Sequence, residues 1–188
     1  MESYDGRHIG CAPGTHAAVA DAVARATPSR EGVLDIGAHS GALLARFRSA
    51  GFSDLVGVDL DPTRFDLEDA SFHRFELNED FSHLLDRGFS VVTATDVIEH
   101  LDNPRHFVSQ VRKLLKPEGI FALSFPNVGF WEGRVKFLLK GELWGFGERN
   151  YRKQRHISPM THDQSRLMFK ELGFEVVSLF AADSFSTP

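Results

Sequence analysis

The sequence has little of what membrane-spanning, disulfide-rich or nucleic-acid-coating proteins need. It contains one cysteine, Cys11, which excludes an internal disulfide framework and suits a reducing, cytoplasmic compartment. The first ten residues hold no apolar run, so no secretory signal peptide is expected there. No apolar run approaches the roughly 20 residues that cross a bilayer. A formal net charge of -5 disfavours a surface that coats nucleic acid. These absences leave a globular enzyme or binding domain.

The composition is that of such a domain, because 42% of the 188 residues are hydrophobic and 25% are charged. Short apolar runs typical of strands alternate with segments of helical periodicity. Strands are predicted at 32–37, 54–62, 71–77, 89–97, 120–127 and 175–180, and helices at 15–26, 40–51, 103–115 and 161–174. This alternation predicts an α/β fold with a doubly wound, mainly parallel sheet of six strands. We expect a single domain over 1–188 with an aromatic and basic insertion at 129–160.

In such sheets ligands bind beyond the carboxyl ends of the strands. The loop Gly37-Ala38-His39-Ser40-Gly41 follows the first predicted strand, and the amides at the start of the next helix could face a polar ligand. Asp59 follows the second strand about 20 residues later, the usual separation for a carboxylate that accepts from ribose hydroxyls. The pair predicts a nucleoside-binding site.

Five stretches, in order and spacing, resemble the class I S-adenosylmethionine-dependent methyltransferases of the broad ubiquinone and polysaccharide-biosynthesis type. They are VLDIGAHSG, VGVDLDP, FSVVTATDVIEHLDNP, LLKPEGIFALSFPN and LGFEVV, and the resemblance runs from about 33 to 177. It implies a Rossmann-like fold with S-adenosylmethionine as cofactor. The loop lacks the G-x-G-x-x-G spacing, which makes a nicotinamide-dependent reductase a distant alternative. Since such proteins usually add an antiparallel strand after the sixth, this sheet is expected to lack its last strand or to be trimmed.

The resemblance also implies which residues meet the cofactor. Asp35, Gly37, Ala38 and Gly41 would line its amino-acid end, Asp59 would bind the ribose, Leu60, Glu76 and Leu77 would meet the adenine, and Ala94, Thr95 and Asp96 would flank the sulfonium. His39 would either turn outward or donate to the cofactor carboxylate. For the acids, and most of all for Glu76, the alternative is a helix cap or a solvated turn.

Three side chains, Glu99, His100 and His156, are the candidate catalytic groups, with His100 as a base that deprotonates an acceptor hydroxyl. The expected reaction is methyl transfer to an oxygen of a small-molecule or glycan acceptor. No divalent metal is expected; the alternative is that Asp96 joins these three in a metal site like that of small-RNA 2′-O-methyltransferases. Glu99 and His100 could also simply cap the next helix. The remaining alternatives are an RNA 2′-O-methyltransferase and a non-catalytic cofactor-binding subunit.

The insertion favours an anionic acceptor, because four cations lie close together in it, Arg149, Arg152, Lys153 and Arg155. A solvated loop is the alternative. Its aromatic part, FWEGRVKFLLKGELWGFG, predicts a lid over the pocket, or else an interfacial helix resting on a membrane. Nucleic acid is not expected as a partner except under the RNA alternative. The sequence leaves the oligomeric state open.

Overall fold

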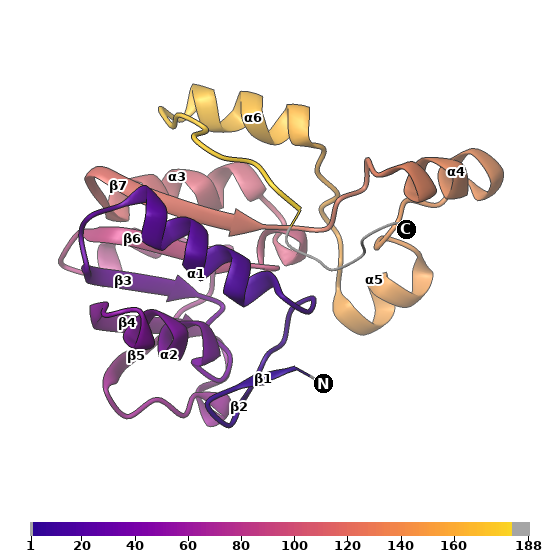
Figure 1. Cartoon of the computed structure of the whole chain (residues 1–188). Helices are drawn as coiled ribbons and strands as arrows, with labels where there is room; N and C mark the ends of the chain where they lie inside the picture. Colours follow the sequence, from indigo (N-terminus) through magenta and orange to yellow (C-terminus); the bar gives the residue numbers. More distant parts are fainter. Residues whose placement is uncertain (1, 182–188) are drawn as a thin grey trace.

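The computed structural model describes residues 2–181. Its main sheet has five parallel strands in the order β5-β4-β3-β6-β7 (Figure 1). The strands are β3 (Glu31–Ile36), β4 (Ser53–Asp59), β5 (Ala70–Arg74), β6 (Phe89–Thr95) and β7 (Leu115–Ser124). The order reverses between β3 and β6, which is the switch point where ligands bind in such sheets. The predicted doubly wound, parallel α/β fold is confirmed.

Helices cover both faces of the sheet (Figure 1). The helices α1 (Thr15–Ala26) and α2 (Ala42–Ser49) bury their apolar sides with β3 and β4 in one cluster, and α3 (Pro104–Leu114) and α6 (His162–Glu171) pack into a second. The start of α3 follows from Asn103, whose side chain accepts from the His106 amide at 3.0 Å, and from Pro104 in the first turn. Three short 3-10 helices, η1 (Pro62–Arg64), η2 (Ser82–Leu84) and η3 (Ile98–His100), follow strand ends or loops.

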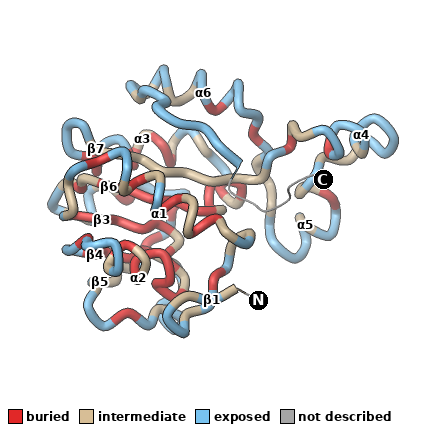
Figure 2. The backbone as a smooth tube through the Cα atoms, in the orientation of Figure 1, coloured by how far each residue is buried: buried red, intermediate tan, exposed pale blue. Residues whose placement is uncertain are grey.

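The two central strands are buried on both faces, as the sequence pattern predicts. Every residue of β3 after Glu31 is buried, and β6 is buried except at Ser90 (Figure 2). The loops that follow these strands therefore start from rigid backbone, which favours precise placement of side chains beyond their carboxyl ends.

The predicted sixth strand is wrong. Residues 175–180 form no strand, and Val177 and Leu179 are 71% and 68% exposed. In the described part of the chain β7 is the edge strand, and residues 175–180 form no ladder of hydrogen bonds with it, which a strand at this edge needs. Within residues 2–181 no antiparallel strand joins this sheet; the stretch 182–188 lies outside the described residues.

Three further segments differ from the sequence pattern. An antiparallel hairpin of β1 (Ser3–Tyr4) and β2 (Arg7–His8), which was not predicted, precedes α1. The strand β7 begins at Leu115, before the predicted 120, with a register shift against β6. The insertion contains two helices, α4 (Trp131–Lys140) and α5 (Glu148–Gln154), which project beyond the carboxyl ends of the strands (Figure 1). In residues 2–181 no helix has the length and apolarity to cross a bilayer.

Candidate functional site

A cavity of about 390 Å³ lies at the carboxyl ends of the central strands. Its walls include most of the predicted cofactor residues, namely Gly37, Ala38, His39, Asp59, Leu60, Glu76, Leu77, Thr95 and Asp96, together with the candidate base His100. The volume is within the range of roughly 300–1,000 Å³ common for small-molecule sites. Asp35, Gly41, Ala94, Glu99 and His156 are not among its lining residues.

The loop after β3 is fastened to β4 by its own backbone. The amides of Gly37 and Ala38 both donate to the Val58 carbonyl, at 2.8 and 3.0 Å. Gly37 has φ +78, and a Cβ there would lie 2.5 Å from Val97 Cγ2, so no other residue fits without displacement. These two amides are therefore used within the fold, whereas the amides expected to face a ligand are those at the start of α2, and that contact stays a prediction.

Asp59 joins the ends of β3 and β4. Its Oδ2 accepts from the His39 amide at 2.8 Å, and its Oδ1 accepts from the Leu60 amide at 2.7 Å. The carboxylate is thereby held at the cavity wall in a fixed orientation. A carboxylate so placed can still accept from hydroxyl groups through its remaining lone pairs.

The side chain of His39 is held by the N-terminal hairpin and by Arg64. Its φ is +47, and its ring lies 5.6 Å from that of His8. Arg64 Nη1 lies 2.9 Å from His39 Nε2. A guanidinium only donates, so Nε2 accepts and a neutral ring carries its proton on Nδ1. Burial and the charge of Arg64 lower the pKa of His39, which agrees with a neutral ring. Its contact with a cofactor stays a prediction.

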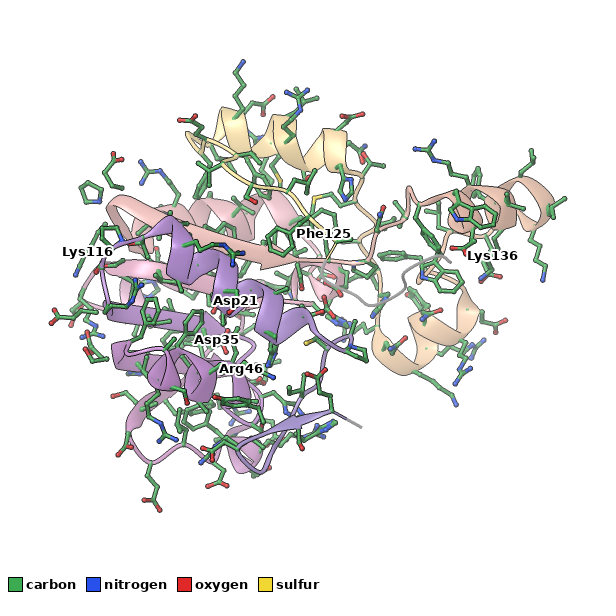
Figure 3. The ribbon with its side chains drawn as sticks, viewed as in Figure 1. Asp21, Asp35, Arg46, Lys116, Phe125 and Lys136 are labelled. Atoms are coloured by element: carbon green, nitrogen blue, oxygen red, sulfur yellow. The ribbon has the colours of Figure 1, made fainter. Side chains whose placement is uncertain are left out.

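Asp35 and Gly41 lie behind the loop rather than on the cavity wall. Asp35 is 2% exposed and accepts from Thr93 Oγ1 at 2.7 Å, within the sheet (Figure 3). Burial raises its pKa to about 7. Gly41 precedes α2 with φ +80, and a Cβ there would lie 3.1 Å from that of Leu67. Both residues shape the loop from inside the protein, and their predicted cofactor contacts stay predictions.

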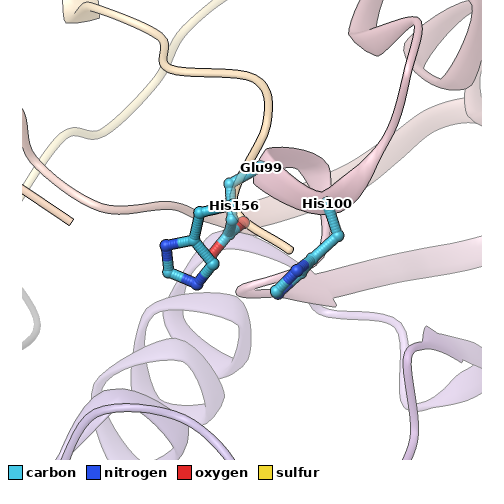
Figure 4. Close-up of side chains that lie close together, drawn as sticks. All are labelled: Glu99, His100 and His156. Carbon is cyan, nitrogen blue, oxygen red and sulfur yellow. The ribbon is translucent and has the colours of Figure 1, made fainter. Parts of the chain in front are cut away.

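The three candidate catalytic side chains do come together (Figure 4). Glu99, His100 and His156 each offer one ligand atom, and these atoms lie within 4.8 Å of one another. The two imidazole rings have centroids 4.9 Å apart. The pairing is set by backbone, because the amides of Ile157 and Ser158 both donate to the Glu99 carbonyl, at 2.9 and 3.0 Å. The end of the insertion is thus fixed to η3.

Within this cluster, the pKa values of Glu99 and His100 are shifted in opposite directions. Glu99 is 1% exposed, neither of its carboxylate oxygens has a hydrogen-bond partner in residues 2–181, and burial together with the charge of Asp96 raises its pKa to about 8. Burial and His156 lower the pKa of His100. A neutral His100 at the cavity wall can accept a proton.

Asp96 does not join the cluster, although a four-residue metal set would need it. Its Oδ1 accepts from Ser124 Oγ at 2.7 Å, and its φ is +51. The short aspartate side chain is bonded to the last residue of β7, so the described part of the chain assembles three of the four donors.

The sequence pattern missed several residues of the cavity wall. His8, Cys11 and His16 reach it from the N-terminal part of the chain. Burial and the charge of Arg46 lower the pKa of His16 to about 4, and burial raises the pKa of the Cys11 thiol to about 12. His8 and Cys11 belong to no predicted element, and His16, although it lies in the predicted helix 15–26, meets the cavity through tertiary contacts that the sequence pattern does not contain. Of the four clustered cations of the insertion, only Arg155 lines the cavity.

A profile of a methyltransferase domain family matches residues 12–179, so the chain belongs to that family. Two curated relatives are ubiquinone biosynthesis O-methyltransferases. The mitochondrial enzyme of Dictyostelium discoideum is 29% identical over 116 residues, which are 52% of this chain and 36% of the relative. That of Neisseria meningitidis is 29% identical over 106 residues, 50% of this chain and 44% of the relative. The matched region therefore covers less than half the length of either relative.

Solved methyltransferase structures share the fold. A Bacillus halodurans protein assigned to the methyltransferases superposes with a TM-score of 0.67 at 19% identity, covering 85% of this chain and 68% of that one. An amino pentose methyltransferase of Micromonospora echinaspora, solved with SAM bound, has a TM-score of 0.51 at 25% identity and covers 62% of this chain and 50% of that one. The class I methyltransferase fold is confirmed.

Proposed function

We propose that this protein transfers a methyl group from S-adenosylmethionine to an oxygen of a small-molecule or glycan acceptor that carries an anionic group. The observation that carries the proposal is one cavity lined by both Asp59, whose carboxylate would bind a ribose, and His100, whose lowered pKa favours a neutral imidazole. Family membership and the named O-methyltransferase relatives support the same reaction.

The reaction needs positioning and one proton transfer. The acceptor oxygen attacks the methyl carbon in line, the bond from carbon to sulfur breaks, and S-adenosylhomocysteine leaves. A hydroxyl acceptor must lose its proton, and His100 would take it. Thr95 and Asp96, at the end of β6, would flank the sulfonium.

The anionic group of the acceptor is argued from Arg155. Arg155 is one of the residues that line the cavity, and its side chain forms no ion pair within residues 2–181. By contrast, Arg152, three residues earlier, is paired with Glu148 at 2.8 Å. A guanidinium at the cavity wall would hold a carboxylate or phosphate with two parallel hydrogen bonds.

Cofactor binding is tested by calorimetry with S-adenosylhomocysteine. Asp59→Asn is expected to weaken binding roughly ten- to hundredfold, because it replaces a charged acceptor by a neutral one. Asp61→Asn is the matched control, since Asp61 is near in sequence and does not line the cavity. Equal affinities of both variants would contradict the ribose role of Asp59, and no binding by the wild type would overturn the proposal.

The acceptor class is tested with labelled S-adenosylmethionine and pairs of acceptors that differ only by a carboxylate. Protocatechuate is compared with catechol, and galacturonate with galactose. The carboxylates are expected to be preferred, and Arg155→Gln to remove that preference.

The role of His100 as the base has its own test. His100→Asn is expected to abolish turnover while binding of S-adenosylhomocysteine persists. The control is His83→Asn, which changes an exposed histidine of η2. Full turnover by His100→Asn would refute the base.

A metal-assisted reaction on an RNA 2′-hydroxyl is the second candidate, and Glu99 is the observation that favours it. Both buried carboxylate oxygens of Glu99 are without partners among the described residues. His156 places Nδ1 2.7 Å from the Gly145 carbonyl, which leaves its Nε2 as the ligand atom. Together with His100 these residues would fit a divalent ion, which would polarise the acceptor hydroxyl when bound.

The two candidates differ in their need for metal. Calorimetric titration with Mn²⁺ and turnover of a short RNA with and without EDTA separate them. Metal binding that Glu99→Gln abolishes, with RNA turnover sensitive to EDTA, would support the second candidate. Turnover of the carboxylate acceptors that EDTA leaves unchanged would support the first. Cofactor binding without any methylated product would instead indicate a non-catalytic binding subunit.

A further inference from the structure

The helix α4 presents apolar side chains to solvent instead of to the protein. Trp131, Val135, Leu138 and Leu139 are 61%, 46%, 83% and 75% exposed. Their spacing of four, seven and eight residues from Trp131 places them on one face. The buried residue of this helix is Gly133, on another face. This face of α4 is therefore apolar and exposed, whereas the apolar face of a helix that covers a core is buried; Phe137, which is 51% exposed, lies outside this face.

The contacts of α4 with the rest of the insertion hold it in this orientation. A Cβ at Gly133 would lie 2.9 Å from Phe130 and 3.3 Å from Trp144, so these aromatic residues pack against the glycine. Lys136 pairs with Glu142 and lies 5.7 Å from the centre of the Trp144 ring. The apolar face is left unpartnered within residues 2–181, and Figures 1 and 2 show α4 projecting from the body with mostly exposed residues.

The same segment is basic in an acidic protein. Residues 129–155 contain seven arginines and lysines against three glutamates, whereas the whole chain has a net charge of -5. Two of these cations are paired with glutamates of the segment. The others form no ion pair among the described residues: Arg134, Lys140, Arg149, Lys153 and Arg155. The apolar face of α4 therefore belongs to a segment with an excess of positive charge, to which α4 itself contributes the unpaired Arg134 and Lys140.

These observations decide between two occupants of the face. If a second copy of the chain covered this face, two basic segments would lie against each other. In addition, a helix of three turns would bury far less surface than the roughly 800 Å² per partner of a stable interface. An anionic lipid surface complements both features, because it accepts apolar side chains at the boundary of its acyl chains and attracts nearby lysines and arginines. We propose that α4 lies in the interface of a negatively charged membrane, with Trp131, Leu138 and Leu139 inserted.

This surface is independent of the proposed reaction, since neither a cofactor nor an acceptor is part of the argument. It does place the lipid surface on the same side of the sheet as the cavity, beyond the carboxyl ends of the strands (Figure 1).

Vesicle flotation tests the proposal. Wild-type protein is mixed with vesicles of phosphatidylcholine alone, or of phosphatidylcholine with one third phosphatidylglycerol, at low and high salt. We expect flotation with the anionic vesicles at low salt and its loss at high salt. The double variant Leu138→Ser, Leu139→Ser is expected to lower the bound fraction roughly tenfold or more.

The matched control is Leu84→Ser, Leu167→Ser, which removes two leucines that are 48% and 53% exposed on other elements. It should float as the wild type does. Retained binding of S-adenosylhomocysteine shows that a variant has folded. Wild-type protein that stays unbound, equal flotation with both vesicle types, or equal loss in both double variants would overturn the proposal. A wild-type dimer in ultracentrifugation that only the α4 variant dissociates would assign the face to a second copy instead.

Discussion

Replacement of Asp35 by asparagine should make the unfolding free energy less dependent on pH. Burial raises the pKa of this carboxyl from 3.8 to about 7, although the hydroxyl of Thr93 donates to it at 2.7 Å. Between those values the unfolded chain is ionised and the folded protein holds the proton, so unfolding releases a proton. The unfolding free energy attributable to Asp35 is therefore fully present below pH 3.8 and falls as the pH rises to about 7.

The magnitude follows from about 1.4 kcal/mol for each pKa unit. From pH 5 to pH 8 the ionisation of Asp35 should lower the wild-type unfolding free energy by about 3 kcal/mol, and the uncharged amide of the Asp35→Asn variant cannot contribute this fall. Urea denaturation of both proteins at the two pH values measures it. The variant is expected to be less stable than the wild type at pH 5, because a new amide N–H lacks a partner, and to gain about 3 kcal/mol relative to it at pH 8. Asp86→Asn, at an exposed position, removes the same charge and should show no such difference. A stability difference between Asp35→Asn and wild type that is the same at both pH values would refute the reasoning.

Three other predictions concern single contacts. Gly37→Ala should lower the unfolding free energy more than Gly51→Ala, as measured by urea denaturation. Both positions have a positive φ, which costs an alanine about 1 kcal/mol or more, but only at position 37 would a Cβ also meet a neighbour. Equal losses of stability in the two variants would contradict the clash. The thiol of Cys11 should react with iodoacetamide at pH 8 about a hundredfold slower than free cysteine, or slower still, because burial raises its pKa to about 12; reaction at the free rate would show an accessible thiolate. Thr161→Ala removes the capping box of α6 and should lower the unfolding free energy by about 1 kcal/mol, seen as a lower melting temperature, whereas an unchanged melt would mean that packing alone fixes this helix end.

The elements that could be predicted from the sequence are those whose signal is local. The start of α3 at Asn103-Pro104 and the cap of α6 at Thr161 depend on side chains that bond to nearby amides. The buried strands β3 and β6 depend on short, mainly apolar runs. Residues 175–180 have a similar apolar content and form no strand, because strand formation also needs a neighbour to pair with and layers to cover it.

The residues of the candidate site also differ in whether the sequence could predict them. Asp59 was found because parallel strands bring their carboxyl ends to one edge, whereas Thr95 was expected from the family resemblance; both line the cavity. His8 and His16 could not be found, because the N-terminal segment reaches the cavity through contacts between residues distant in sequence, including Ser40 Oγ donating to the His8 carbonyl at 2.6 Å. The clustering of Glu99 with His156, which are far apart in the sequence, was expected only from a family resemblance, and backbone bonds between η3 and the segment after α5 account for it.

The loop after β3 shows why a histidine can occupy the centre of a glycine-containing turn. Packing inside the protein leaves no room for a side chain at Gly37 or Gly41, since added Cβ atoms would lie 2.5 Å from Val97 and 3.1 Å from Leu67. The position of His39 needs only a positive φ, which histidine adopts more readily than branched residues do, and its ring packs against Gly10. Its amide donates to Asp59 whatever the side chain is. The glycines are therefore required by packing inside the fold, and the central position is free to carry a side chain that fastens the N-terminal hairpin over the cavity.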